Sequence, residues 1–244
     1  MATKNGSPAG AAPDRSSPDG FAAWNEEMVE RYDIERYYER AHPVVRWLEH
    51  RRLAALLRLA RPRPGDRVLE VGCGAGHVLE RFAVAIRTGI DLSPGMLART
   101  RRRLGAAVTL SRASADRLPF PDAAFDVVVC TEVLEHTPDP AAVVAELMRV
   151  AGPHGRVVVS IPNETEIDRV KRVLGRTPVL RRWLRTLAAE GNEWHLHRFD
   201  LALLRRIIAG SARIRGLVGI PGRLLPLRYV ALLGAEPRAA GRPA

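Results

Sequence analysis

The chain has 244 residues, enough for one domain of about 200 residues with additional segments. Hydrophobic residues make up 46%, so a packed core is expected, and no apolar run reaches the roughly 18 residues of a membrane span. The formal net charge of +11 comes almost entirely from arginine, because only Lys4 and Lys171 are lysines. A solvated basic surface explains this charge, and the alternative is an anionic partner, either a membrane surface or a nucleic acid.

The two ends of the chain are expected to be disordered tails, at residues 1–20 and 236–244. The first is rich in Gly, Pro, Ala and Ser and lacks the apolar stretch of a signal peptide. The two cysteines show neither a disulfide framework nor a zinc-site spacing, which favours a reducing cytoplasm. One domain is therefore expected over 21–235.

Residues 21–62 are predicted to form N-terminal helices, because apolar residues recur there at three- and four-residue steps. Beyond this region, short apolar runs alternate with helical patterns. Strands are expected at 68–71, 88–91, 108–113, 125–132 and 155–162, and helices at about 75–85, 94–104 and 139–150. This order predicts an α/β fold with a doubly wound, mostly parallel sheet.

After Pro162 the alternation stops, and residues 163–197 are predicted to form a helical insertion with two arginine-rich amphipathic segments. A helix at about 199–209 follows. Two weak apolar runs, at 212–220 and 227–233, would complete a seven-stranded sheet as an antiparallel pair. Pro226 makes the second of these the least favourable strand.

Three glycines directly follow the first predicted strand, in RVLEVGCGAGHVLE (67–80). Glycine permits unusual dihedral angles and close approach to the backbone, and the N-terminus of a following helix favours a negatively charged group. The dinucleotide fingerprint is G-x-G-x-x-G. Here the third glycine, Gly76, comes one residue early and His77 takes its place. The pattern therefore predicts a nucleotide-type site and disfavours a nicotinamide dinucleotide.

This stretch resembles motif I of the class I S-adenosylmethionine-dependent methyltransferases, especially the small-molecule group that includes the ubiquinone/menaquinone methyltransferases. Three later segments match that family in order, and they are GIDLSPGML (89–97), ASADRLPFPDAAFDVVVCTEVLEH (113–136) and GPHGRVVVSIPN (152–163). The resemblance implies a Rossmann-like fold and S-adenosylmethionine as cofactor. It also implies methyl transfer to a small-molecule acceptor, such as a quinone, a lipid or a secondary metabolite.

The resemblance further implies a set of residues around the cofactor. These are Glu70, Gly72, Gly74, Gly76, Asp91, Leu92, Met96, Ala115, Asp116 and Thr131. The glycines would approach the amino acid end of the cofactor, with Glu70 supporting their turn. The Asp91 carboxylate can accept hydrogen bonds from the ribose hydroxyls, Leu92 and Met96 would flank the adenine, and Ala115 and Asp116 would read its amino edge.

Several of these residues have structural alternatives. Asp91 can instead cap the next helix together with Ser93. Met96 can be plain core packing, and Asp116 can be an ordinary loop acid. Thr131 is assigned near the methyl donor because ligands of such sheets bind outside the carboxyl ends of the strands.

Three histidines are candidates for the chemistry. His136 follows the fourth predicted strand, and His195 and His197 precede the helix at 199–209. The sulfonium is already activated, so alignment supplies much of the rate and a base is needed only where the acceptor loses a proton. The alternative role of each histidine is structural, namely a hydrogen bond that holds a loop in place. No histidine, cysteine or carboxylate cluster has the spacing of a metal site, so no metal is expected.

The segment 166–188 combines an apolar face with an arginine-rich face, which is typical of an interfacial helix. It predicts peripheral contact of a cytoplasmic protein with an anionic membrane, and a lid with solvated charges is the alternative. Two other functions stay open. An RNA methyltransferase is disfavoured because aromatic residues are only 5% of the chain and no RNA-binding module is appended. A non-catalytic S-adenosylmethionine-binding module is disfavoured by the intact glycines and Asp91.

Overall fold

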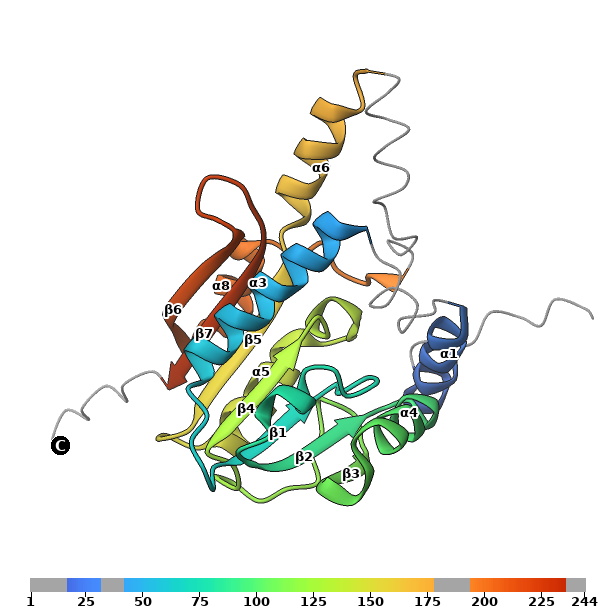
Figure 1. The fold of residues 1–244 in the computed structure, drawn as a ribbon, viewed down its shortest axis with the longest axis vertical. Helices are drawn as coiled ribbons and strands as arrows, with labels where there is room; N and C mark the ends of the chain where they lie inside the picture. Colours follow the sequence, from blue (N-terminus) through green and yellow to red (C-terminus); the bar gives the residue numbers. More distant parts are fainter. Residues whose placement is uncertain (1–16, 32–41, 178–193, 236–244) are drawn as a thin grey trace, which may run out of the picture.

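A seven-stranded sheet runs through the molecule (Figure 1), and the computed structural model describes residues 17–31, 42–177 and 194–235. The strand order is β3-β2-β1-β4-β5-β7-β6. The strands are β1 (Arg67–Val71), β2 (Ile86–Asp91), β3 (Val108–Arg112), β4 (Val127–Thr131), β5 (Arg156–Pro162), β6 (Ala212–Pro221) and β7 (Pro226–Ala235). The first five are parallel, and β7 runs antiparallel between β5 and β6. The predicted doubly wound, mostly parallel sheet is confirmed.

Helices cover both faces of this sheet. They are α1 (Pro18–Arg31), α3 (Pro43–Ala60), α4 (Pro94–Leu104), α5 (Pro140–Ala151), α6 (Glu164–Leu174) and α8 (Leu201–Ile208). Helices α4, α5 and α8 begin where a polar side chain accepts a hydrogen bond from the first turn, at Ser93, Asp139 and Asp200. Proline follows Ser93 and Asp139, where its missing N–H is not needed.

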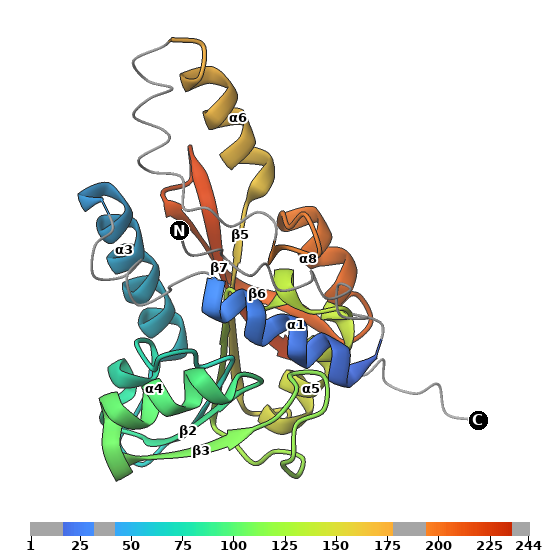
Figure 2. The same cartoon turned by 90° about the vertical axis from the view of Figure 1, so that its right-hand side faces the viewer.

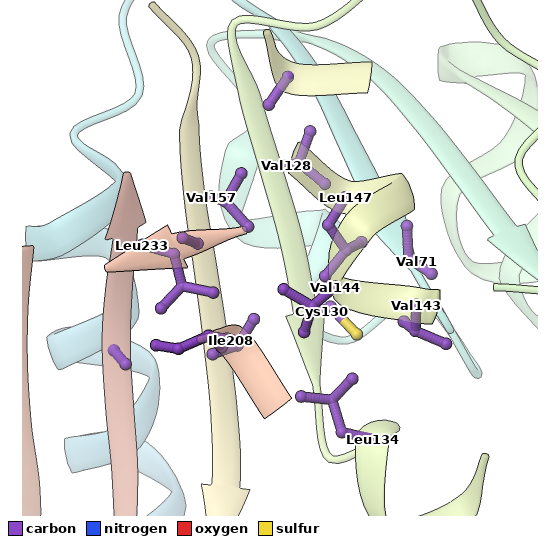
Figure 3. Packing of buried hydrophobic residues seen from close by; sticks show 14 of the residues in the cluster. Val71, Val128, Cys130, Leu134, Val143, Val144, Leu147, Val157, Ile208 and Leu233 are labelled. Carbon is purple, nitrogen blue, oxygen red and sulfur yellow. The ribbon is translucent and has the colours of Figure 1, made fainter. Parts of the chain in front are cut away.

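Side-chain alternation along the strands divides the core into two layers. Val128 and Cys130 of β4 belong to a buried cluster with α5 and α8, whereas Val127 and Val129 belong to a second cluster with α3. Figure 3 shows Cys130 beside Val144 of α5 in the first layer. The sheet is thus buried on both sides, as expected for parallel strands.

The helix predicted at about 75–85 is wrong. This connection contains only one 3-10 turn, Leu79–Phe82, and β2 already begins at Ile86. Leu79 and Phe82 are both fully buried. A spacing of three residues places two side chains on one side of a 3-10 turn, so a single turn is enough to bury both. The glycines are therefore not followed by the N-terminus of an α-helix.

The ends and the insertion are described only in part. Helix α1 begins at Pro18, inside the segment expected as a tail, while residues 1–16 and 236–244 lie outside the described residues. Helix α6 occupies the first part of the predicted insertion, and its second amphipathic segment, within 178–193, also lies outside them. None of the helices within the described ranges has both the length and the apolar character that a membrane crossing requires.

Candidate active site

The glycine turn after β1 has a backbone that other residues rarely adopt. Gly72, Gly74 and Gly76 have φ angles of 72°, 51° and 82°, in the left-handed region that glycine enters without steric cost. A Cβ added at Gly72 would lie 2.3 Å from Cγ2 of Val133, whereas a Cβ at Gly74 would meet no atom within 4 Å among the described residues. Gly72 is thus required by packing against the segment after β4, and Gly74 faces space that a ligand can approach.

Asp91, the last residue of β2, fastens this turn to the start of α4. Its Oδ2 accepts a hydrogen bond from the Gly74 amide at 2.8 Å, and its Oδ1 accepts one from the Ser93 amide at 2.9 Å. Burial raises the pKa of the Asp91 carboxyl, and these amides oppose the rise. The α4 cap itself is Ser93, whose Oγ accepts from the Met96 amide at 3.0 Å. Each oxygen of Asp91 has further lone-pair capacity, so the ribose role stays a prediction.

Glu70 lies beneath the turn, with only 2% of its surface exposed. Burial raises the pKa of its carboxyl well above the ordinary value, and Arg52 of α3 and a hydrogen bond from the Leu79 backbone lower it in part. The bond to Leu79 holds the segment that follows the glycines. This is the kind of contact that the predicted supporting role requires.

Met96 takes part in a small buried cluster beside the turn. It is 1% exposed and packs with Val29 of α1 and Ala75, and Trp194 packs against the same cluster. Figure 2 shows α1 close to α4, and contacts between these helices agree with that view. Core packing therefore describes Met96 in this structure, and its contact with adenine stays a prediction.

The other predicted cofactor residues lie around the same edge of the sheet. Leu92 and Ala115 are partly buried, Asp116 is exposed, and Thr131 is buried at the end of β4. Ala115 packs against the core layer under α5. The exposed carboxylate of Asp116 leaves its adenine role and the loop-acid alternative both open.

The structure brings two of the three candidate histidines together. The ring centroids of His136 and His195 are 4.9 Å apart, with the rings edge to face. His136 donates its Nδ1–H to the Trp194 carbonyl oxygen at 3.1 Å, and His195 donates its Nδ1–H to a carboxylate oxygen of Glu164. Burial lowers the pKa of His136 to about 4, so this imidazole is neutral at pH 7.

His197 is not part of this pair. Its Nε2–H points to the carbonyl oxygens of Thr137 and Pro138, at 2.9 and 3.2 Å. These contacts attach the segment before α8 to the segment after β4. The bracing alternative therefore describes His197.

Two site residues were missed by sequence reasoning, Glu135 and Glu164. Glu135 is 1% exposed, and its carbonyl oxygen accepts hydrogen bonds from the amides of Leu196 and His197 at 2.8 and 3.3 Å. Glu135 could have been found from the sequence, because a carboxylate directly precedes the candidate His136 and follows an apolar strand. Glu164 offers no such signal, because its partner His195 lies 31 residues further along the chain.

A network of charges lies next to Glu135. Glu132 has a φ of 54°, and its carboxylate accepts a hydrogen bond from Ser160 at 2.8 Å and pairs with Arg228 at 3.3 Å. Arg52 pairs with Glu49 at 2.7 Å and donates to Ser160 at 3.3 Å. Burial raises the pKa of Glu132, but Arg228 and Arg52 outweigh burial and lower it overall. The network fixes the turn that carries Glu135 and His136.

Comparison with known proteins finds relatives for the central part of the chain. Residues 69–159 match the family model of the methyltransferase domain. The chain is 40% identical over 123 residues to the ubiquinone biosynthesis O-methyltransferase of Aromatoleum aromaticum, covering 48% of this chain and 53% of that protein. It is 38% identical over 138 residues to the 27-O-demethylrifamycin SV methyltransferase of Amycolatopsis mediterranei, covering 50% of each. The chain spans about half the length of the curated relatives it matches.

A solved structure extends the similarity in fold to most of the chain. The magnesium protoporphyrin IX methyltransferase of Synechocystis, solved with bound SAH, has a TM-score of 0.64 at 17% identity, covering 90% of this chain and 100% of that one. At this identity the match shows the fold alone. Residues 69–159 therefore match the methyltransferase-domain family, and the chain carries the Rossmann-like fold of that solved methyltransferase.

Proposed function

We propose that the chain transfers the methyl group of S-adenosylmethionine to a hydroxyl oxygen of a small-molecule acceptor. The observation that carries this proposal is the pair of imidazoles, His136 and His195, beside the carboxyl end of β4. Trp194 joins this pair to the glycine turn, because its ring lies 4.7 Å from that of His136 and it packs against the cluster that contains Ala75. Two relatives, the ubiquinone biosynthesis O-methyltransferase and the 27-O-demethylrifamycin SV methyltransferase, have names that give oxygen as the methylated atom.

In this reaction the acceptor oxygen attacks the methyl carbon in line with the carbon–sulfur bond, and S-adenosylhomocysteine leaves. Because the sulfonium is a good leaving group, holding the two reactants in line supplies much of the rate. His136 and His195 are proposed to hold the acceptor hydroxyl, since the Nδ1–H of each is already engaged and Nε2 is the nitrogen with a lone pair to offer. A quinone precursor, a lipid and a secondary metabolite all provide such a hydroxyl.

The cofactor half of the proposal is tested at Asp91. We expect Asp91→Ala to weaken binding of S-adenosylmethionine about a hundredfold, because two hydrogen bonds to a charged acceptor contribute about 1.5 kcal/mol or more each. Isothermal calorimetry measures the affinity. Asp126→Ala is the matched control, since Asp126 pairs with Arg67 immediately before β4, away from the carboxyl ends of the strands. Unchanged affinity in Asp91→Ala would remove the ribose role, and tight binding of NADH would argue against the cofactor.

The acceptor half is tested with methyl-tritiated cofactor. Label is expected in a hydroxyl-bearing compound of quinone, lipid or metabolite extracts and absent from total RNA. Transfer of label to RNA would support the alternative RNA methyltransferase. Cofactor binding without any transfer would support the non-catalytic module.

We further propose that the end of the molecule formed by α6 and the β6–β7 hairpin contacts an anionic membrane. Figures 1 and 2 show both elements at the same end, and Asn163, just before α6, bonds to the carbonyl oxygens of Pro226 and Leu227. Leu224 at the hairpin is fully exposed and Val173 of α6 is 54% exposed. The last turn of α6 carries Lys171 and Arg172. Exposed apolar side chains beside cations are what an interfacial contact requires.

Leu224→Glu is expected to reduce co-flotation with vesicles of phosphatidylcholine and phosphatidylglycerol several-fold. The added carboxylate is repelled by the anionic surface, and the apolar contact is lost. Ile86→Glu is the control, because Ile86 is 63% exposed at the start of β2. Equal flotation of the two variants, or no flotation of the unmodified chain, would retire the membrane contact.

A further inference from the structure

Glu135, His136 and His195 form a group that sequence reasoning did not expect. One ligand atom from each residue lies within 4.8 Å of the others. Glu135 and His136 come from the 3-10 turn Leu134–His136 that follows β4, and His195 comes from the segment before α8. The turn and this segment are joined by backbone hydrogen bonds from Leu196 and His197 to the Glu135 carbonyl oxygen. The group is therefore held together by two rigidly connected pieces of backbone.

Each of the two histidines has its Nδ1–H engaged by an acceptor. A metal-ligating imidazole usually donates its other ring N–H to a carbonyl or carboxylate, which fixes both its tautomer and its orientation. His136 donates Nδ1–H to the Trp194 carbonyl oxygen, and His195 donates Nδ1–H to Glu164. Nε2 is thus the nitrogen of each ring that can ligate an ion, and the two imidazoles would then hold the acceptor hydroxyl through the ion rather than directly.

The carboxylate of Glu135 is the second, independent observation. The side chain is 1% exposed, and its Oε2 has no hydrogen-bond partner among the described residues. A buried carboxylate oxygen without a partner is costly. A cation between Glu135 and the two imidazoles would give this oxygen a partner.

We propose that Glu135, His136 and His195 bind one divalent first-row transition-metal ion that holds the acceptor hydroxyl; this inference rests on the proposed function. Two imidazoles and one carboxylate favour zinc, iron, cobalt or nickel over magnesium and calcium, which prefer oxygen ligands alone. Three protein ligands leave open positions for the acceptor oxygen and for water.

The ion would make the acceptor a better nucleophile. A hydroxyl bound to a divalent ion loses its proton to solvent near neutral pH more readily than a free one. The acceptor oxygen would then form its bond to the methyl carbon while the carbon–sulfur bond breaks, and the electron pair of that bond would stay on sulfur. The methylated oxygen is a weaker ligand without a negative charge, so the product leaves.

Cobalt binding tests the site directly. The full chain, stripped with a chelator, is titrated with CoCl2 and followed by its visible absorption and by calorimetry. We expect one ion per chain, and binding more than about tenfold weaker in Glu135→Gln and in His195→Ala. Glu164→Gln, which changes only the group that orients His195, is expected to weaken binding about tenfold to a hundredfold. His154→Ala, an exposed histidine outside the group, is expected to bind cobalt like the unmodified chain.

Binding of S-adenosylmethionine, measured on every variant, shows whether the variant is folded and separates the two proposals. If the stripped chain binds the cofactor but gives no cobalt spectrum, or if Glu135→Gln and His195→Ala bind cobalt unchanged, the metal site is overturned and the proposed function stands. If cobalt binds with the expected dependence on these residues and no hydroxyl acceptor is ever methylated, the site stands and the proposed function fails.

Discussion

Replacing Gly72 by alanine is expected to lower the free energy of unfolding by about 3 kcal/mol and to abolish binding of S-adenosylmethionine. The left-handed φ of 72° costs a residue with a Cβ about 1–2 kcal/mol. The new methyl would also lie 2.3 Å from Cγ2 of Val133, and relieving such a contact in a packed site costs about 1–3 kcal/mol. Urea denaturation measures the first effect and calorimetry the second.

Two other glycines separate the contributions to this loss. Gly65 has a φ of 83° and no described atom within 4 Å of an added Cβ, so Gly65→Ala should cost only about 1 kcal/mol and leave cofactor affinity unchanged. Gly74 has the same open surroundings. Gly74→Ala should therefore be about as stable as Gly65→Ala and yet bind the cofactor poorly. If Gly72→Ala were no less stable than Gly65→Ala, the contact with Val133 would have no energetic weight.

Replacing Arg52 by alanine is expected to lower the free energy of unfolding by about 3 kcal/mol, because it removes one of the two arginines, Arg52 and Arg228, that neutralise buried Glu49 and its neighbours. Arg52 is 1% exposed. Its guanidinium bonds to Glu49 and to Ser160, and Ser160 in turn bonds to Glu132. Chemical denaturation followed by circular dichroism measures the change.

Arg67→Ala is the matched control for this ion pair. The side chains of Arg67 and Asp126 are 51% and 41% exposed, and an exposed pair contributes at most about 1 kcal/mol. The difference between the two variants should therefore be at least about 2 kcal/mol. A loss in Arg52→Ala as small as that in Arg67→Ala would mean that water reaches the network.

Strands β1, β4 and β5 could be predicted from the sequence because each is a short apolar run between polar turns, and the sheet buries both of its faces. The helix at 75–85 could not, since the same apolar spacing suits one 3-10 turn when the chain must enter β2 only four residues after Phe82. The periodicity of apolar residues does not show how many residues remain for a connection before the next strand begins.

The glycine turn and Asp91 were predictable because they lie in one local stretch of a known pattern. The group at the acceptor side was not, because its parts come from three places along the chain. His195 meets Glu164 across 31 residues, and it meets Glu135 and His136 only through the return of the chain before α8.

Two pairs of residues make up the histidine group, and their places in the chain bear on how such a protein can change its substrate. One pair is Glu164 and His195, and the other is Glu135 and His136. The first pair lies after residue 159, beyond the part that matches the family model, and the second lies within it. Exchanging the residues after β5 would therefore replace Glu164 and His195 of the proposed acceptor site while the glycine turn keeps its sequence. Trp194 lies in the exchanged part and contacts His136 and the cluster that contains Ala75. The residue at this position would therefore have to stay compatible with the unchanged residues 69–159.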